Sequence, residues 1–395
     1  MTAKPLVWLL LLFQAGAPLL LHAQNTNRFT GNDTIFRIGV LLPLHSNRVF
    51  VNSEEDFFFP AETQTAVEYY QGLLLALEEL ANRGMNADIQ VVNTSDSAQL
   101  EQDLRLLQNA HLLFTTAQGH ALKHINRFSA RHQVPLVYAG PVPSMQTWNN
   151  PYFILTSATL RTHCEFLFDY IYQRHFADRI LLIGQPQVAQ EKELTSLFLA
   201  ANQRKVDSGL YPLPMVVLAD SARPLLRQLN DSLSSLLTNV VIVASTDAHF
   251  INSVTTQLVR HNSKRIQLIG MPGWRALDRL SLSALDTLNC LASSAFFYDR
   301  NDSALVAFRK RYQSRFQLSP SENAVRGYDH GLYFGNQLYR FGRWMMGAFP
   351  PPAYSPLACV FKVVPVMKGE DVIYRENKGL FLLTVDRRKW RKATG

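Results

Sequence analysis

The sequence is poor in the residues that build disulfide-rich or zinc-binding proteins. Only three cysteines occur in 395 residues, and they lie far apart, at Cys164, Cys290 and Cys359. This number and spacing exclude a disulfide framework and a zinc knuckle. One pair would be able to bridge in an oxidising compartment. We expect buried free thiols instead, because an unpaired cysteine behaves as a small apolar side chain.

Catalytic signatures are also missing. The sequence holds no G-x-S-x-G elbow, no Walker A loop and no G-x-G-x-x-G turn, which disfavours acyl transfer, nucleotide hydrolysis and dinucleotide chemistry. His120 and His124 stand four apart on a predicted helix, the spacing of two metal ligands, but no acid lies between them. We therefore predict no catalytic residue, no metal site and no cofactor. A hydrolase with a metal on these two histidines is the weaker alternative.

Charge is sparse and lacks long runs. Charged residues make up 18% of the chain against 47% hydrophobic ones, which excludes a disordered chain, and the net charge is +8. The basic clusters at 309–311 and 387–392 are short, and only Trp390 interrupts them with an aromatic ring. Such clusters are typical of solvated faces, so we do not expect nucleic acid as a partner.

A long apolar run is found only near the N-terminus. Lys4 precedes the run Leu6–Phe13, and Gln14 and Pro18 break the apolar stretch before it reaches the length of a membrane crossing. Residues 1–23 are therefore predicted to be a cleaved export signal rather than an anchor helix. No cysteine follows the run, so no lipoprotein anchor is expected, and the predicted location is periplasmic or secreted.

Beyond the signal, short apolar segments alternate with helical patterns. Apolar residues recur at spacings of three and four between Val67 and Ala81, which predicts a helix that ends at Gly84. Ser319 and Glu322 form a capping box around Pro320, which predicts a later helix start with Ser319 as the N-cap. Predicted strands fall into two sets: 35–42, 89–92, 112–114 and 134–138, then 179–184, 214–218, 239–243 and 265–269.

Mostly apolar strands separated by helices are typical of a parallel sheet covered on both faces. The length suits two domains. The predicted fold class is therefore α/β, with two Rossmann-like lobes and a cleft between them. Two closing strands, at 359–366 and 379–385, are predicted to flank a polar turn at 369–377.

Three segments resemble the type I periplasmic binding proteins, specifically the leucine/isoleucine/valine receptors of ABC importers. Ile38–Pro43 is similar to the opening strand of this family, and Tyr70–Leu80 to its first helix, with the glycine and the acidic end in register. Ala324–Asp329 is similar to its late Tyr-Asp helix. The closing segment Phe361–Val385 resembles a Bacteroidetes-type subgroup, whose members often carry a LysM module that is not visible here.

The resemblance implies a division into lobes. In this family the chain crosses between the lobes three times, which implies a three-crossover hinge near Ser157, near Asp299 and at the Pro350 run. The expected lobes are listed by residue: 24–157 with 299–349 for the N-terminal lobe, and 158–298 with 350–395 for the C-terminal lobe.

Candidate ligand-binding residues follow the strands, because open α/β sheets bind ligands beyond the carboxyl ends of their strands. In the first half these are Thr116 and Gln118 after one strand, Gly140 after the next, and Ser157 and Thr159 at the first crossing. The resemblance implies that such loops hold the carboxylate and ammonium groups of an amino acid. Helix capping by the same hydroxyls is the alternative.

In the second half the candidates are Gln185, Thr246, Asp247 and Trp274. Asp247 is suited either to bind an ammonium group or to cap the next helix, and Trp274 either to wall an apolar ligand or to pack in the lobe. Amino-acid receptors of this family usually place an acid after the strand that here ends at Gly184. Gln185 stands there instead, which argues against a free amino acid.

The predicted function is a periplasmic solute-binding protein that captures a small polar, amino-acid-like ligand between its lobes for an ABC importer. The alternative is a cell-envelope regulator on the same fold, similar to activators of peptidoglycan synthases. The predicted partners are a small-molecule ligand and either an ABC permease or a cell-wall protein. The expected oligomeric state is a monomer or a weak dimer.

Overall fold

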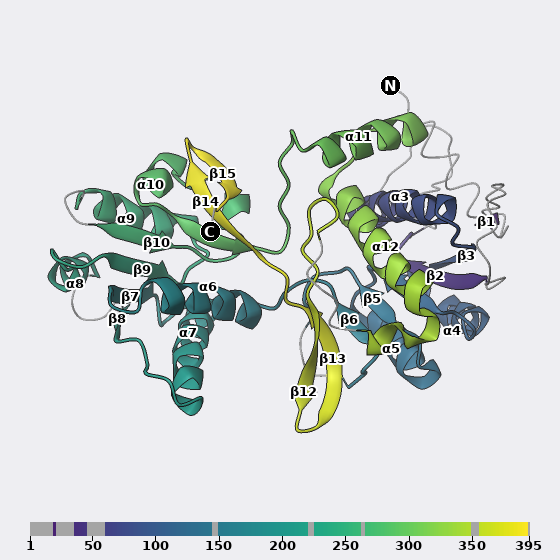
Figure 1. Cartoon of the computed structure of the whole chain (residues 1–395), viewed down its shortest axis with the longest axis horizontal. Helices are drawn as coiled ribbons and strands as arrows, with labels where there is room; N and C mark the ends of the chain where they lie inside the picture. Colours follow the sequence, from purple (N-terminus) through teal and green to yellow (C-terminus); the bar gives the residue numbers. More distant parts are fainter. Residues whose placement is uncertain are drawn as a thin grey trace. The chain divides into compact units, whose positions relative to one another are not determined.

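The chain forms two compact units, each built from discontinuous segments (Figure 1). The computed structural model describes residues 19–20, 35–45, 60–143, 149–219, 225–261, 265–348 and 355–393. The first unit takes residues up to Ser157 and Tyr298–Gly379, and the second takes Ala158–Phe297 and the residues from Leu380 onward. The predicted export signal lies outside the described residues except for Leu19–Leu20.

An eight-stranded sheet forms the first unit. Its order is β1 (Leu19–Leu20), β3 (Ala87–Asn93), β2 (Phe36–Leu42), β4 (Leu112–Thr115), β5 (Leu136–Tyr138), β6 (Phe153–Leu155), β13 (Asp371–Asn377) and β12 (Val363–Lys368). The strands from β3 to β13 pair in parallel, whereas β1 and β12 pair antiparallel at the two edges. The predicted parallel sheet is therefore confirmed for the central strands.

Helices cover this sheet on both faces (Figure 1). They are α3 (Ala61–Asn82), α4 (Ser97–Leu106), α5 (Gly119–His132), α11 (Ser303–Phe316) and α12 (Glu322–Phe341), followed by the 3-10 helix η3 (Gly342–Gly347). The apolar stripes of α4 and α5 share one core cluster with Leu113 and Leu136 of the sheet. The predicted helix between Val67 and Ala81 is α3, and Gly84 follows its end with a φ of 101°.

Helix α3 packs against α12 without room for side chains at their closest points. A Cβ at Gly72 of α3 would overlap the carbonyl of Ala324, and one at Gly327 of α12 would overlap the carbonyl of Tyr69. Glycine lets two helix backbones approach this closely. The end of the contact is polar, since the Tyr328 hydroxyl donates to Oε2 of Glu79 at 2.6 Å.

Asp329 of α12 fixes the chain that leads into the closing strands. Its side chain is fully buried and accepts hydrogen bonds from the amides of Leu357 (3.1 Å), Ala358 (2.8 Å) and Cys359 (2.7 Å). Burial raises the pKa of Asp329 to about 7, and the three amides partly oppose this shift. The residues before β12 are therefore held on α12, inside the first unit.

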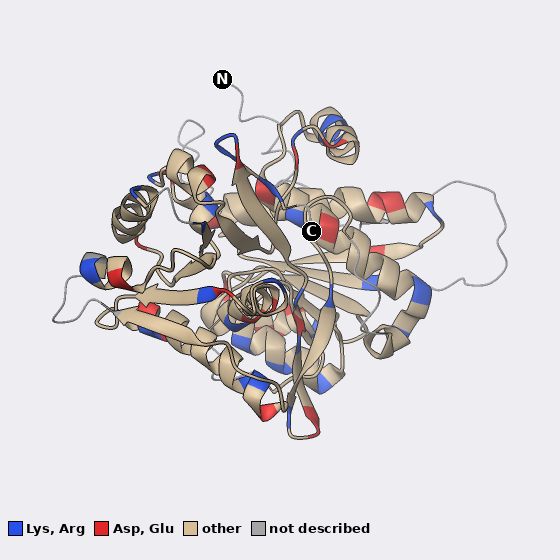
Figure 2. Ribbon diagram, turned by 60° about the vertical axis from the view of Figure 1, so that its left-hand side comes forward, with Lys and Arg blue, Asp and Glu red and all other residues tan. Residues whose placement is uncertain are grey.

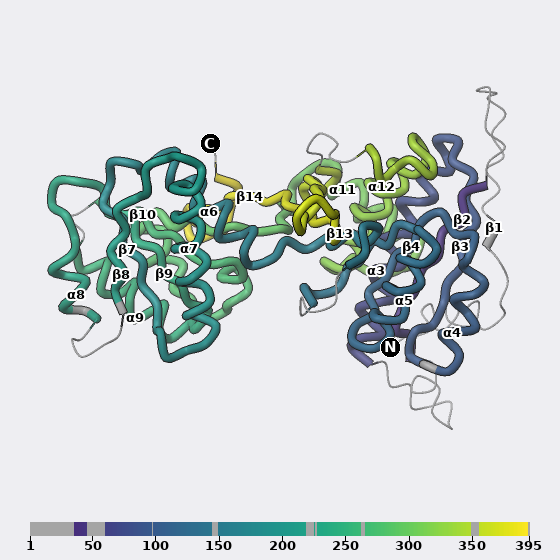
Figure 3. The backbone as a smooth tube through the Cα atoms, turned by 90° about the horizontal axis from the view of Figure 1, so that it is seen from below, coloured from purple at the N-terminus to yellow at the C-terminus, as the bar shows by residue number. Residues whose placement is uncertain are grey.

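Because Asp329 holds this segment in the first unit, the third passage between the units lies later in the chain than predicted. The chain passes from one unit to the other after Ser157, after Phe297 and after Gly379 (Figure 3). The sequence prediction of a passage at Pro350 is corrected, because β13 pairs in parallel with β6 and extends the first unit's sheet. The polar turn predicted at 369–377 is likewise mostly strand β13, and the hairpin turns at Gly369, where φ is 62°.

One helix start is shifted from its prediction. Ser321, not Ser319, is the N-cap of α12, and its hydroxyl accepts from the amide of Ala324 at 3.3 Å. The same hydroxyl donates to Oε2 of Glu68 on α3 at 2.7 Å. The contact with α3 therefore selects the second of the two serines.

A seven-stranded sheet forms the second unit. Its order is β15 (Lys389–Lys392), β14 (Phe381–Asp386), β11 (Leu291–Ser294), β10 (Ile266–Ile269), β9 (Asn239–Val243), β7 (Arg179–Gly184) and β8 (Met215–Ala219). The strands from β11 to β8 are parallel, and β14 and β15 are antiparallel. The helices are α6 (Leu160–Arg174), α7 (Ala189–Asp207), α8 (Leu225–Ser232), α9 (Ala248–Val259) and α10 (Leu282–Thr287), with the 3-10 helix η2 (Trp274–Ala276).

The basic run 387–392 forms the tip of the β14–β15 hairpin and the edge strand β15, seen as the blue turn in Figure 2. Its basic side chains are exposed, as predicted for a solvated face. Exposed charge on an edge strand also opposes pairing with another chain.

Cys164, Cys290 and Cys359 are free and buried, so the prediction of buried free thiols is confirmed. Among the described helices, none combines the length and the apolar character that a membrane crossing requires.

The α3–α12 contact predicts the effect of a single methyl group. Gly72→Ala should lower the free energy of unfolding by at least about 2 kcal/mol, because the helices must separate to admit the Cβ. Gly347→Ala is the control, since a Cβ there meets no atom within 4 Å. Urea unfolding followed by circular dichroism measures both. Equal stability of the two variants would contradict the described packing.

A buried histidine predicts how the first unit responds to acid. Nδ1 of His330 lies 3.2 Å from the hydroxyl of Tyr69, and burial lowers the pKa of His330 to about 3. The unfolded chain binds a proton near pH 6.5, so stability should be present above that pH and fall as the pH drops toward 3. From pH 7 to pH 5 the loss should be about 2 kcal/mol relative to His330→Gln. The measurement is the free energy of unfolding of wild type and His330→Gln between pH 7 and pH 5, with the exposed His132→Gln as control. The same pH dependence in wild type and His330→Gln would exclude the effect.

Candidate functional site

The carboxyl ends of β2, β4, β5 and β6 lie at one edge of the first sheet, because these strands are parallel neighbours. The hydroxyl of Thr115 donates to the carbonyl of Leu41 at 2.8 Å, and the amide of Ala117 donates to the same hydroxyl at 3.1 Å. These bonds fix the loop between β4 and α5, which carries the predicted residues Thr116 and Gln118.

Thr116 differs from its neighbour. Its side chain is only 8% exposed, and among the described residues its hydroxyl has no hydrogen-bond partner. A buried hydroxyl without a partner costs about 1–3 kcal/mol, so such groups are rare unless something else pairs with them. Gln118 is exposed at the N-cap position of α5, where its side chain makes no capping bond.

The loops after β5 and β6 join the same edge. The hydroxyl of Thr156 donates to the carbonyl of Tyr138 at 2.9 Å, and that of Ser157 donates to the carbonyl of Gly140 at 3.4 Å. The structure therefore brings together four of the predicted residues: Thr116, Gln118, Gly140 and Ser157. Thr159 lies in the second unit, where it caps α6 by accepting from the amide of Thr162 at 3.3 Å.

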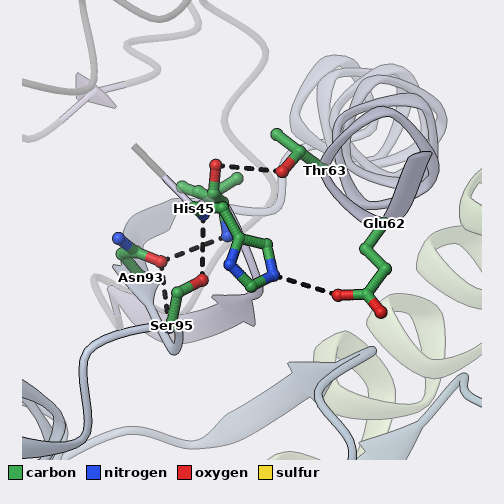
Figure 4. A network of polar contacts seen from close by, with 6 residues as sticks. His45, Glu62, Thr63, Asn93 and Ser95 are labelled. Carbon is green, nitrogen blue, oxygen red and sulfur yellow. Dashed lines mark hydrogen bonds and ion pairs between the residues drawn. The ribbon is translucent and has the colours of Figure 1, made fainter. Parts of the chain in front are cut away.

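A polar network fixes the backbone after β2 (Figure 4). The amide of His45 donates to Oγ of Ser95 at 2.9 Å, and Nε2 of His45 lies 3.0 Å from Oε2 of Glu62. The hydroxyl of Thr63 donates to the carbonyl of Leu44 at 3.1 Å. His45 has a φ of 43°, a conformation unusual for a non-glycine residue, and these bonds hold it. Sequence reasoning missed this network, since it depends on loops that only the fold brings together.

At the carboxyl ends of the strands in the second sheet, buried side chains bond to one another and to the neighbouring loops. Glu191 of α7 is 2% exposed; its Oε2 accepts from the amide of Gln185 at 2.9 Å, and its Oε1 accepts from the hydroxyl of Ser245. Nε1 of Trp274 donates to the carbonyl of Ser245 at 2.9 Å, and the ring is 1% exposed. Both oxygens of this acid are therefore used inside the unit.

Of the remaining candidates in the second unit, two have structural roles and two are partly exposed. Asp247 caps α9, accepting from the amides of His249 (2.7 Å) and Phe250 (3.3 Å). Trp274 is a core residue, which favours the packing alternative over a ligand wall. Gln185 and Thr246 remain partly exposed at the strand ends. Glu191 was missed by sequence reasoning because it stands in the first turn of a helix rather than directly after a strand.

A pocket of about 260 Å³ lies in the first unit, between α5 and the loop after β5. Ten residues line it, among them Gln118, Lys123, Arg127, Tyr138 and Pro141. The lining includes two basic side chains and no acidic one. The pocket therefore begins at the predicted residue Gln118 and continues along the side of α5.

The two histidines of the weaker alternative lie on the same helix, with ring centroids 4.5 Å apart. Nδ1 of His124 lies 3.6 Å from Oε1 of Glu101. Within the described ranges, no group of three or more histidine, cysteine or acidic side chains is placed to hold a metal ion. The described structure therefore gives this histidine pair no third ligand of these kinds.

The fold is similar to solved structures of ABC transporter binding proteins. A chain from Rhodospirillum rubrum named for a branched-chain amino acid ABC transporter is 14% identical and aligns over 91% of this chain and 100% of its own, with a TM-score of 0.62. This chain has the type I periplasmic binding protein fold. The resemblance drawn from the sequence is thus confirmed at the level of fold.

Two further structures agree. The periplasmic ligand-binding protein of a branched-chain amino acid ABC transporter from Burkholderia xenovorans is 12% identical over 91% of this chain and 94% of that one, with a TM-score of 0.54. An ABC transporter substrate-binding protein from Desulfitobacterium hafniense, in complex with Leu, is 13% identical over 91% and 100%, with a TM-score of 0.51. No protein-family model and no curated protein sequence matches the chain.

The buried acid of the second unit predicts a stability effect. Glu191→Gln replaces one acceptor oxygen by a donor amide, which leaves either the N–H of Gln185 or the O–H of Ser245 without its acceptor and should cost about 1–3 kcal/mol. The control is Glu193→Gln, an exposed position on the same helix, which should change stability by less than about 0.5 kcal/mol. Chemical unfolding measures both. A Glu191→Gln variant as stable as the control would show that the carboxylate does not tie the two loops.

Proposed function

We propose that this protein is a periplasmic solute-binding protein that captures a small polar ligand at the carboxyl edge of the first unit's sheet and delivers it to an ABC importer. The observation that carries the proposal is the hydroxyl of Thr116, which is buried at this edge without a partner among the described residues. A ligand that accepts or donates a hydrogen bond there would supply the missing partner.

The surroundings of Thr116 suit ligand binding. The start of α5 at Gly119 lies three residues further along the chain, and helix N-termini present free amides to negatively charged groups. Gly140 and Ser157 come from the neighbouring strand ends and are already held against each other. A preorganised edge of this kind binds without the cost of ordering its loops.

The proposal takes the transport role from the structural neighbours, which are ABC transporter solute-binding proteins. In this proposal residues 1–23 serve as an export signal that directs the protein to the periplasm, and the protein catalyses no reaction. The importer's permease is the proposed protein partner.

One observation favours the second candidate, a cell-envelope regulator on the same fold. Glu191, whose Oε2 accepts from the amide of Gln185, spends both oxygens on partners within the unit. This carboxylate is therefore not free for the ammonium group of an amino acid. A regulator needs no such group, and neither does a ligand without an amine.

Thr116→Val tests the proposal, because valine keeps the shape of threonine and removes the hydroxyl. The free protein should be as stable as wild type or up to about 1 kcal/mol more stable, since an unpaired buried hydroxyl is lost. Ligand affinity should fall roughly tenfold, the worth of one hydrogen bond of about 1.4 kcal/mol. Thermal shift against a metabolite library finds the ligand, and isothermal titration calorimetry compares the variants.

Thr115→Val is the matched control. It should destabilise the free protein by about 1 kcal/mol or more, because the carbonyl of Leu41 loses its donor. Wild-type affinity in Thr116→Val would contradict the proposed site. A protein that no metabolite stabilises, but that retains a cell-wall protein in a pull-down, would favour the regulator; a saturating ligand should add about 2.7 kcal/mol at one hundred times its Kd.

A further inference from the structure

The charged residues that line the pocket beside α5 are all positive. Lys123 and Arg127 both line it, and the other eight lining residues are uncharged. Positive charge without a neighbouring acid raises the local concentration of anions and favours their binding. The sequence analysis did not single out either residue.

The two cations stand four residues apart, on one side of α5. Like charges at this spacing repel each other by about 0.2–0.5 kcal/mol in a helix. Both side chains belong to exposed residues, and in the part of the chain that the structure describes neither forms an ion pair or a hydrogen bond. Arg311, by contrast, is paired, since it bonds Oε2 of Glu79 at 2.6 Å. The pocket therefore keeps two charges that no described side chain neutralises through an ion pair or a hydrogen bond.

Neutral donors complete the lining. The side chain of Gln118 makes no capping bond, and the first amides of α5 follow it at Gly119, which has a φ of 58°. Asn126 is held in place, because its Oδ1 and its carbonyl both accept from Nδ2 of Asn150. Arginine binds carboxylate and phosphate in a two-pronged geometry, whereas lysine acts as a point charge. Together these groups fit an anion with more than one charged oxygen group.

We propose that this pocket binds a small organic dianion, of which a dicarboxylate is the simplest kind, through Lys123, Arg127 and Gln118. The inference rests on the proposed function and names its ligand class: the captured solute is acidic rather than a zwitterionic amino acid. A volume of about 260 Å³ equals that of roughly nine water molecules, which suits a small metabolite. The use of Glu191 within its own unit agrees with a ligand that carries no ammonium group.

Calorimetry on the full protein tests this class directly. The probes are succinate and glutarate as dicarboxylates, glycerol 3-phosphate as a phosphate ester, and leucine and glycine as zwitterions. A dianion should bind more tightly than either amino acid, and its affinity should weaken as salt is added, because exposed charges are screened. Binding of the phosphate ester alone would also support a dianion site and would assign the source of the charge to phosphate.

Paired variants separate pocket charge from overall charge. Lys123→Gln with Arg127→Gln should weaken dianion binding by roughly tenfold for each cation removed. Lys310→Gln with Arg131→Gln removes the same charge from exposed helix positions outside the pocket and should leave affinity unchanged. If a library compound other than a dianion binds, and binds equally to both double variants, the dianion inference is overturned while the solute-binding function stands. If no compound of any class binds to the wild type, both fail.

Discussion

The close approach of α3 to α12 is the contact on which the first unit depends, because it positions α12 and the chain that leads from α12 to β12 and β13. Gly72 and Gly327 let the two backbones meet, and this places Asp329 where its carboxylate can hold the amides of 357–359. The chain that follows is thereby delivered to the sheet as β12 and β13.

One side chain, that of Asn377, connects the segment placed by this contact to the candidate site. Nδ2 of Asn377, at the end of β13, donates to the carbonyl of Thr156 at 3.2 Å and to that of Val360 at 3.0 Å. With β13 beside it, β6 is an interior strand of the sheet, and the loop that carries Ser157 starts from a fixed point. A helix contact between glycines thus helps to preorganise a binding edge that neither helix lines.

The two units differ in how the polar groups at the carboxyl ends of their strands are paired. In the second unit Glu191, Ser245 and Trp274 are joined by hydrogen bonds at the strand ends, so these groups need no ligand as a partner. In the first unit no described residue pairs with the hydroxyl of Thr116 or with the charges of Lys123 and Arg127 in the adjacent pocket. The polar recognition of a solute is accordingly expected from the first unit. The fold supplies the edge, and a few side chains decide what it binds.

Most of the central strands could be predicted, because a strand such as Asn239–Val243 is apolar along its whole length when both faces of the sheet are covered. Strand β13 could not: its charged and polar residues read as a turn, and only the pairing with β6 and the bonds of Asn377 make it a strand. Thr116 and Ser157 could be proposed from the sequence because they follow strands directly. Lys123, Arg127 and Glu191 could not, since their positions within helices carry no local signal of a site.

Hydrogen–deuterium exchange with and without a saturating ligand is the measurement that tests the central claim most directly. The account predicts slower exchange at the amides of 116–119, Gly140 and Val142, which belong to the loops after β4 and β5. Unchanged exchange in both loops, with protection confined to other parts of the chain, would contradict a ligand site at the carboxyl edge of the first sheet.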